Sequence, residues 1–169
     1  ALPNAEAPLK TGLQIDPSAV IAHTATIGAG VVIGANSVVG ANSVLGSGVH
    51  IGNNCRIGDN CTLSHCELDD GCRLQAGVVL GAAGFGFVIS GDKPVLIPHI
   101  GILRLGRNVC VGANSAIDRG SLGDTVIGDF VMIDNLVHIA HNCEIGDRCV
   151  IAGQVGIAGS TTLEAGVMV

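Results

Sequence analysis

The chain has 169 residues, a length typical of one domain with a substantial core, and only 2% of them are aromatic although 48% are hydrophobic. The formal net charge of −6 and the lack of Lys/Arg runs argue against a nucleic-acid partner, because phosphate binding needs clustered cations. No apolar run approaches the roughly 20 residues of a membrane span, and the opening residues lack the order of a signal peptide. We therefore expect no membrane span and a cytoplasmic protein.

The first 14 residues predict an irregular linker, and a six-residue repeat begins at Ile15. From there an aliphatic residue recurs at every sixth position, in hexads such as IGANSV and IGNNCR. Neither the spacing of an amphipathic helix nor the alternation of a half-buried strand fits this period. Each hexad instead predicts a short strand and a turn, with its first and its small fifth residue pointing inward and Gly, Asn and Asp in the turn. The sequence thus predicts an all-β fold, a parallel β-helix over residues 15–169.

The hexads resemble those of the left-handed β-helix proteins, which place three hexads in each coil. The left hand is an exception to the usual right-handed crossover, and it comes from the resemblance because the period alone predicts only a solenoid. A coil then has 18 residues and rises by about 4.8 Å, so residues 18 apart are neighbours in space. The repeat slips by one residue at Leu68 and resumes at Leu105 after an interruption.

The interruption, residues 84–104, holds Phe85 and Phe87, two of the three phenylalanines of the chain. Its SGDKP stretch has the residues of a tight turn and lies between two apolar runs. It therefore predicts a loop or hairpin that projects from the β-helix. The segment is either a tolerated surface insertion or, since its aromatic residues stand out in this chain, a wall of a pocket.

The cysteines and histidines do not form a metal-binding pattern. The chain has no C-x-x-C pair, and it lacks the H-x-x-x-x-H pair of hexapeptide β-helices that resemble the gamma-class carbonic anhydrases, so we expect no metal. Five of the seven cysteines occupy the small fifth position and are expected to act as compact hydrophobic residues; they are Cys55, Cys61, Cys72, Cys143 and Cys149. Cys55 and Cys72 should lie on adjacent coils, as thiols in a reducing cytosol.

The stretch IDNLVHIAHN, residues 133–142, places His138 and His141 three residues apart and also contains Asp134 and Asn135. One coil beyond His141 the 18-residue register places Gly159, which would leave room and an exposed backbone amide beside the imidazole. Position in the hexad alone leaves a solvated surface histidine as the alternative.

Four stretches, in this order, resemble the UDP-3-O-acylglucosamine N-acyltransferases of lipid A biosynthesis, and the resemblance covers nearly the whole chain from residue 15. They are GAAGFGF (81–87), IPHIG (97–101), IDRGSLGDTVIG (117–128) and IDNLVHIAHNCEIGDRCVIAGQVGIAGS (133–160). The family implies transfer of an (R)-3-hydroxyacyl chain from acyl carrier protein to the 2-amino group of UDP-3-O-(3-hydroxyacyl)-glucosamine. It also implies a homotrimer with active sites between subunits, and no bound cofactor beyond the carrier protein's phosphopantetheine.

Residue by residue, the resemblance implies that His141 is the general base and that the Gly159 backbone amide stabilises the oxyanion. An imidazole suits the first role, because its pKa of about 6.5 lets it accept the proton of an attacking amine near neutral pH. Substrate-contact roles fall to Asp134 and Asn135, and to Phe85, Phe87 and His138; position 138 departs from the glutamine of many members.

Two parts of the family's proteins are expected to lie outside this chain: the N-terminal uridine-binding domain and the C-terminal segment that docks the carrier protein. The fragment alone should therefore bind nucleotide poorly. The alternatives are a UDP-N-acetylglucosamine O-acyltransferase of the same pathway, a hexapeptide acetyltransferase that uses coenzyme A, and a non-catalytic structural β-helix. A structural or ice-binding helix should display a regular array of Thr or similar residues, whereas the outward positions here are irregular.

Overall fold

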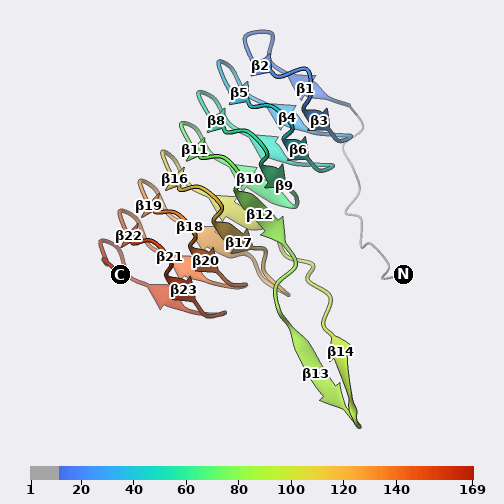
Figure 1. The fold of residues 1–169 in the computed structure, drawn as a ribbon, viewed down its shortest axis with the longest axis vertical. Helices are drawn as coiled ribbons and strands as arrows, with labels where there is room; N and C mark the ends of the chain where they lie inside the picture. The colour runs from blue at the N-terminus through green and yellow to red at the C-terminus, as the bar shows by residue number, and fades with distance from the viewer. Residues whose placement is uncertain (1–11) are drawn as a thin grey trace.

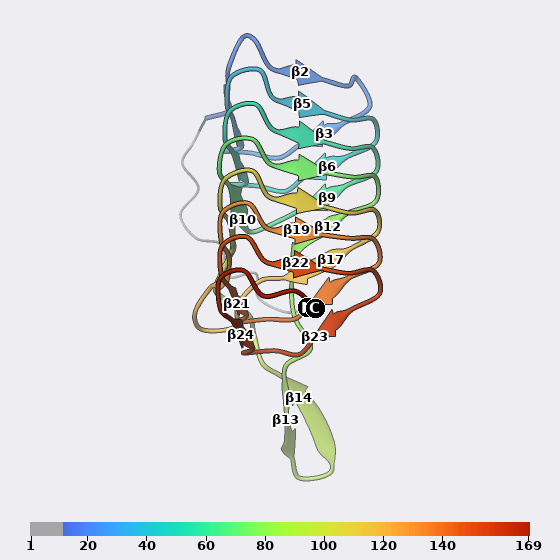
Figure 2. The ribbon, with the colours of Figure 1, turned by 90° about the vertical axis from the view of Figure 1, so that its left-hand side faces the viewer.

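Residues 12–169, which the computed structural model describes, wind into a stack of short strands joined by tight turns (Figure 1). The strands form three parallel sheets, which are three faces of a prism, and a further pair forms a hairpin. Figure 2 shows the coils stacked along the prism and the hairpin extending away from them. This is the predicted parallel β-helix; most of the segment 1–14, predicted to be irregular, lies outside the described residues.

The three faces are made of strands from successive coils. Face 1 contains β1 (Gln14–Ile15), β4 (Val32–Ile33), β7 (His50–Ile51), β10 (Cys66–Leu68), β15 (Leu103–Leu105), β18 (Thr125–Ile127), β21 (Glu144–Ile145) and β24 (Thr162–Leu163). Face 2 contains β2 (Val20–Ile21), β5 (Val38–Val39), β8 (Arg56–Ile57), β11 (Arg73–Leu74), β16 (Cys110–Val111), β19 (Met132–Ile133) and β22 (Val150–Ile151). Face 3 contains β3 (Thr26–Ile27), β6 (Val44–Leu45), β9 (Thr62–Leu63), β12 (Val79–Ala82), β17 (Ala116–Asp118), β20 (His138–Ile139) and β23 (Gly156–Ile157).

The strand register follows the predicted 18-residue coil. Ile15, Ile33 and Ile51 are successive partners on face 1, each 18 residues from the last. Ile51 then pairs with Leu68, only 17 residues on, so the one-residue slip is absorbed between two faces without breaking the sheet. Aliphatic residues therefore stay in columns along the whole prism.

The core consists of the first and fifth residues of the hexads, as predicted. Ile33 and Ile51 represent the first position and Val31 and Cys55 the fifth, and each is at most 2% exposed. No aromatic side chain belongs to the core of the described residues. Cys55 and Cys72 lie in contact on adjacent coils, as predicted.

The turns depend on left-handed backbone at the fourth hexad position. Asn36, Asn54 and Asn142 have φ values of 57°, 57° and 59°, a region that Asn enters more readily than most residues. The same conformation holds the bulkier Phe130 and Leu136, each with φ of 59°. The stack therefore imposes the turn geometry even where the side chain disfavours it.

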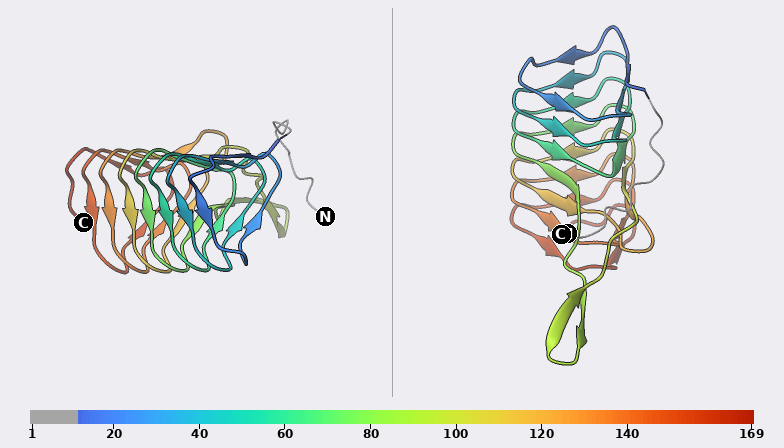
Figure 3. Two further views of the ribbon diagram at one scale, coloured as in Figure 1. Left: turned by 90° about the horizontal axis from the view of Figure 1, so that it is seen from above. Right: turned by 90° about the vertical axis from the view of Figure 1, so that its right-hand side faces the viewer.

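The predicted projecting loop or hairpin is confirmed as a hairpin. β13 (Phe87–Ser90) pairs antiparallel with β14 (Lys93–Leu96), and a two-residue turn at Gly91 and Asp92 joins them, with φ of 63° at Gly91. All eight strand residues are exposed. The right-hand view of Figure 3 shows the hairpin clear of the prism.

The irregular segments gather at one corner of the prism, between face 3 and face 1. The insertion leaves β12 and returns at β15, the loop 119–124 joins β17 to β18, and the turn 140–143 joins β20 to β21. Because β12, β17 and β20 are neighbours in face 3, these three segments lie on successive coils. The motifs that set this chain apart from a plain hexapeptide stack therefore meet at one place.

Among residues 12–169 no helix is long and apolar enough to cross a membrane.

Candidate functional site

His141 lies in the turn after β20, and its neighbours fix which ring nitrogen is protonated. Its Nδ1 lies 2.9 Å from Asn142 Oδ1, which also accepts hydrogen bonds from the Ser121 amide (3.0 Å) and hydroxyl (2.7 Å). Because an amide oxygen only accepts, Nδ1 must donate. The neutral ring therefore presents an unprotonated Nε2, the atom a general base needs.

Asn142 is itself held from several directions. Its backbone amide donates to Thr125 Oγ1 at 2.8 Å and its Nδ2 donates to the Gly123 carbonyl at 3.2 Å. The loop 119–124 thus orients Asn142, and Asn142 orients His141. Asn142 does not stand out in the sequence, because Asn occupies the same fourth position in many ordinary turns of this chain.

Gly159 lies against the other edge of the His141 ring, one coil on, as predicted. A Cβ at Gly159 would lie 2.9 Å from both Cε1 and Nε2 of His141, closer than ordinary contact. The next residue, Ser160, donates its amide hydrogen to the His141 carbonyl at 2.9 Å. Only a glycine leaves the space beside Nε2 free.

His99, whose place beside His141 the sequence does not reveal, packs edge-to-face on His141 with ring centroids 5.2 Å apart. It is 5% exposed, its Nδ1 donates to the Ile97 carbonyl at 3.1 Å, and its Nε2 is buried with no partner among the described residues. A Cβ at Gly84 would lie 3.0 Å from His99 Nε2 and 2.9 Å from His141 Cβ, so the Gly84 backbone covers both rings. The insertion thus forms one wall around His141.

Asp118, the last residue of β17, is a nearly buried carboxylate in the same place. It is 7% exposed, and no group of the described chain donates a hydrogen bond to its side chain. Burial raises its pKa above the ordinary value, while charge on His138, His141 and His99 acts in the opposite direction. His138 Nε2 is 3.7 Å from Asp118 Oδ2, and the His138 side chain is 54% exposed.

Phe85 and Phe87 lie at the rim of this cluster. Their rings meet edge-to-face at 5.1 Å, with Phe85 83% and Phe87 40% exposed. Between them, a Cβ at Gly86 would lie 2.9 Å from His99 Cε1. The aromatic pair therefore flanks the histidines, and its role as a pocket wall stays a prediction.

Within one chain, Asp134 and Asn135 do not lie near His141. They follow β19 at the corner between faces 2 and 3, whereas His141 lies at the corner between faces 3 and 1. Asn135 is engaged locally, since its Oδ1 accepts from the Ala113 amide at 2.7 Å and its Nδ2 donates to Asp134 Oδ1 at 2.9 Å. His141 is seven positions after Asp134, and over these positions the chain runs along face 3 of the prism from one corner to the next.

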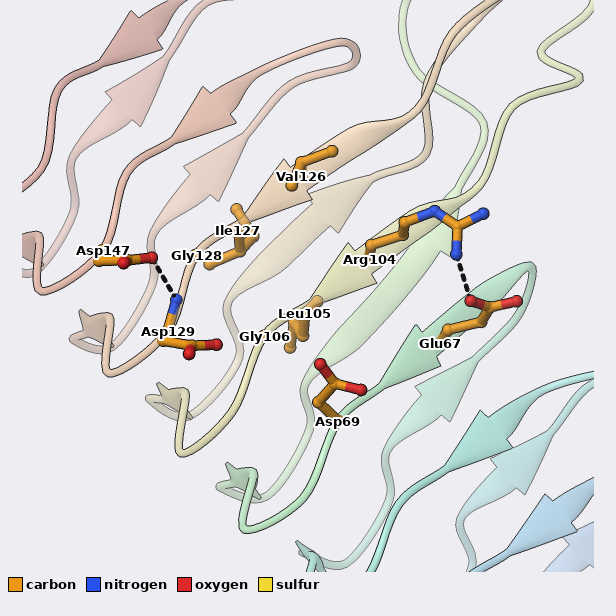
Figure 4. A pocket seen from close by; sticks show the side chains of 10 residues that line it. All are labelled: Glu67, Asp69, Arg104, Leu105, Gly106, Val126, Ile127, Gly128, Asp129 and Asp147. Atoms are coloured by element: carbon orange, nitrogen blue, oxygen red, sulfur yellow. Dashed lines mark hydrogen bonds and ion pairs between the residues drawn. The ribbon is translucent and has the colours of Figure 1, made fainter.

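Other polar groups of the described chain offer no competing centre. A hollow bordered by Glu67, Asp69, Arg104, Asp129 and Asp147 lies at the corner where face 1 strands turn toward face 2 (Figure 4). Its acidic groups are partly neutralised, because Arg104 pairs with Glu67 and Arg107 pairs with Asp129. Within residues 12–169 no group of three or more His, Cys, Asp or Glu side chains could hold a metal ion.

The chain matches the bacterial transferase hexapeptide (six repeats) family over residues 12–41, 32–65 and 124–159, more than half its length. It belongs to this family. Among curated hexapeptide relatives, the UDP-3-O-acylglucosamine N-acyltransferase of Dechloromonas aromatica (strain RCB) is 53% identical over 88 residues, which are 52% of this chain and 25% of the relative. That of Helicobacter pylori (strain ATCC 700392 / 26695) is 47% identical over 96 residues, 56% of this chain and 29% of the relative. The chain thus matches 25% to 29% of the length of these relatives.

Solved structures of hexapeptide proteins share the fold. A UDP-N-acetylglucosamine acyltransferase from Campylobacter jejuni has a TM-score of 0.61 at 27% identity, covering 92% of this chain and 57% of that one. One from Bacteroides fragilis 9343 has a TM-score of 0.56 at 25% identity, covering 87% of this chain and 54% of the other. The predicted left-handed parallel β-helix and the resemblance to UDP-3-O-acylglucosamine N-acyltransferases are confirmed.

Proposed function

We propose that this chain is the β-helix core of an N-acyltransferase of lipid A biosynthesis. It would transfer an (R)-3-hydroxyacyl chain from acyl carrier protein to the 2-amino group of UDP-3-O-(3-hydroxyacyl)-glucosamine. The names of relatives 47% to 53% identical to this chain support the reaction class. The observation that carries the proposal is the hydrogen bond from His141 Nδ1 to Asn142 Oδ1, which leaves Nε2 unprotonated beside Gly159.

In this reaction His141 Nε2 takes a proton from the attacking amine. Imidazole is the usual general base of enzymes near neutral pH, so it can accept that proton and release it to the departing sulfur. Asn142 keeps the ring in the required tautomer throughout, because its Oδ1 holds the Nδ1 proton. The Gly159 backbone amide is the proposed donor to the oxyanion, since the lack of a side chain leaves it open beside the base.

The acyl donor is the thioester on the phosphopantetheine of acyl carrier protein, and the proposal needs no other cofactor. Phe85 and Phe87 at the rim, together with His138, are the proposed substrate contacts of this subunit. Aromatic faces and an exposed imidazole suit a substrate that joins a nucleotide to acyl chains.

A homotrimer would complete the site. The hairpin exposes Val88, Ile89, Val95 and Leu96, each at least half exposed, and a projecting apolar hairpin is typical of an interface. A neighbouring copy would also supply Asp134 and Asn135, which one chain keeps at a different corner from its own His141. The same interface would hold the acyl chain in an apolar groove.

The rival function is O-acylation of UDP-N-acetylglucosamine, which the names of the structural relatives favour. The two functions differ in the acceptor, an amine or a hydroxyl. The test incubates the intact protein with 3-hydroxyacyl carrier protein and either UDP-3-O-acylglucosamine or UDP-N-acetylglucosamine. Acylation of the amine alone is expected. Transfer to the hydroxyl acceptor would place the protein with the structural relatives, and no transfer to either would overturn both functions.

A further inference from the structure

Arg119 differs in its burial from every other Lys or Arg of residues 12–169. Arg119 is partly buried, whereas the others are all exposed; they are Arg56, Arg73, Lys93, Arg104, Arg107 and Arg148. Burial lowers the pKa of Arg119, but a guanidinium stays charged at neutral pH all the same. Arg119 is therefore a lasting positive charge that has lost part of its hydration, which is unfavourable unless an anion or an acceptor replaces the lost water.

No group of residues 12–169 compensates this charge. The Arg119 Nε atom is buried without a hydrogen-bond partner among these residues, and none of their ion pairs includes Arg119. The pKa of the adjacent Asp118 is affected by burial and by nearby histidines, and not by Arg119. The other buried atom without a partner, His99 Nε2, lies at the same corner against His141. The counter-ion of Arg119 must therefore come from outside the described residues.

The Arg119 side chain extends from the base toward the preceding coils. Arg119 is the third residue of its hexad, the position that His141 holds in the next coil. Side chains at this position reach back by one coil, as Asn53 does when its Oδ1 accepts a hydrogen bond from the Ala35 amide at 2.8 Å. Burial and then the charge of Arg119 lower the pKa of His65, which lies two coils before Arg119, in the turn after β9. Arg119 and His65 therefore lie within electrostatic range of each other on one side of the base.

Resting on the proposed acylation of a UDP-sugar, we propose that Arg119, with His65 beside it, binds the diphosphate of the acceptor. The guanidinium offers a planar fork of N–H donors, which suits two phosphate oxygens at once. His65 is exposed, and its neutral imidazole can donate one further hydrogen bond. No covalent bond forms or breaks at this subsite, so it positions the acceptor and leaves the proton transfer to His141.

The position of Arg119 fits the acceptor better than the acyl donor. In a UDP-sugar the 2-amino group and the diphosphate are attached to adjacent ring carbons, so the diphosphate must lie close to the base. Arg119 and His141 hold equivalent positions on strands about 4.8 Å apart. Gly159, the proposed oxyanion donor, lies one coil to the other side of His141 and marks the side of the thioester. The phosphate of the donor is separated from that thioester by the whole pantetheine arm.

A structural role for the guanidinium is the competing explanation. The loop 119–124 is held through its backbone, because the Arg119 amide donates to the Ala82 carbonyl at 2.9 Å and the Thr125 amide donates to the Ile102 carbonyl at 2.9 Å. The buried Nε of Arg119 adds no hydrogen bond to residues 12–169. Removal of the charge should therefore not lower the melting temperature of the free protein, whereas loss of a structural arginine would lower it.

The test measures the Kd of UDP and of uridine for the intact protein by calorimetry, in the wild type, Arg119→Gln and His65→Gln. Arg119→Gln should weaken UDP by about 10- to 100-fold, the value of a charge-assisted hydrogen bond, and should leave uridine unchanged. His65→Gln should weaken UDP by about 2- to 10-fold, as expected for a neutral donor.

Arg148→Gln is the matched control for the loss of charge. Arg148 is exposed in a turn between faces 1 and 2, and its φ of 57° is close to the 65° of the native Gln154, so a glutamine fits there. This variant should bind UDP as the wild type does. Melting curves of all variants without ligand show whether a weaker affinity comes from a loss of structure.

The outcomes separate this inference from the proposed function. The inference is wrong if the wild type binds no UDP, if Arg119→Gln binds UDP as tightly as the control, or if it weakens pantetheine 4′-phosphate in place of UDP. Binding needs no turnover. If the wild type acylates UDP-N-acetylglucosamine and not the amine, the proposed function fails, while the affinities for UDP still decide the role of Arg119.

Discussion

Replacing Gly159 by Ala tests whether His141 must stand where the structure places it. The backbone of Gly159 does not need a positive φ, so an alanine is tolerated there and acts only through its methyl group. That methyl would lie 2.9 Å from Nε2 and Cε1 of His141, and about 0.5 Å of movement is needed to reach ordinary contact. The ring is tied to Asn142 by a 2.9 Å hydrogen bond, so such movement strains or breaks that bond.

A misplacement of about 1 Å can lower a rate on the order of 100-fold, so we expect Gly159→Ala to lower kcat by about 10- to 100-fold. The corner is at the surface, so the free energy of unfolding should change by less than about 1 kcal/mol. Gly156→Ala in β23 is the matched control, because a Cβ there meets nothing within 4 Å. Steady-state transfer assays and thermal melts of both variants provide the comparison. Equal kcat in the two variants would refute the assignment of His141 as a base confined by Gly159.

Three further predictions concern the base, the buried carboxylate and the hairpin. Asn142→Gly is compatible with the backbone φ of 59° at this position but removes the acceptor of the His141 Nδ1 proton, so kcat should fall by about 10- to 100-fold. The melting temperature should fall as well, because Ser121 and Gly123 lose their hydrogen bonds to the same side chain. Asp118→Asn should raise the melting temperature at pH 7. Burial raises the pKa of Asp118 in the folded state above its ordinary value of 3.8, so the wild type loses stability when the pH rises and this carboxyl group ionises. Below pH 3.8 the carboxyl group is neutral in both states, so the variant's higher melting temperature should disappear there. An unchanged or lower melting temperature at pH 7 would contradict this sign. For the proposed homotrimer, Val88→Lys combined with Leu96→Lys should reduce the mass measured by light scattering from three chains toward one. A trimer that stays intact in this variant would show that the hairpin is not part of the interface.

Much of the fold can be predicted from the six-residue period of the sequence. Aliphatic residues at the first position and small ones at the fifth can be buried together only if each hexad is a strand and a turn, which is why the faces and columns were predictable. The contact between His141 and Gly159 followed from the same register, because no insertion separates them. The turn chemistry at Gly91 and Asp92 identified the hairpin.

The six-residue period does not predict where His99, Asp118 and Asp134 lie relative to His141. His99 lies 42 residues before His141, across an insertion whose path no repeat predicts, yet the rings are 5.2 Å apart. Asp118 was part of a recognised motif, but only the fold shows that it is nearly buried and lies beside His138. Conversely, Asp134 seemed close to His141 in sequence but lies at another corner, since each hexad turns the chain onto a new face.

The most direct test of the central claim is the single-turnover rate of transfer from 3-hydroxyacyl carrier protein to UDP-3-O-acylglucosamine, in the wild type and in His141→Ala. A general base contributes roughly 100- to 10,000-fold, so the variant should be slower by at least about 100-fold while melting at nearly the same temperature. A variant that transfers the acyl chain within about tenfold of the wild-type rate would contradict the account, because another residue would then remove the proton from the amine.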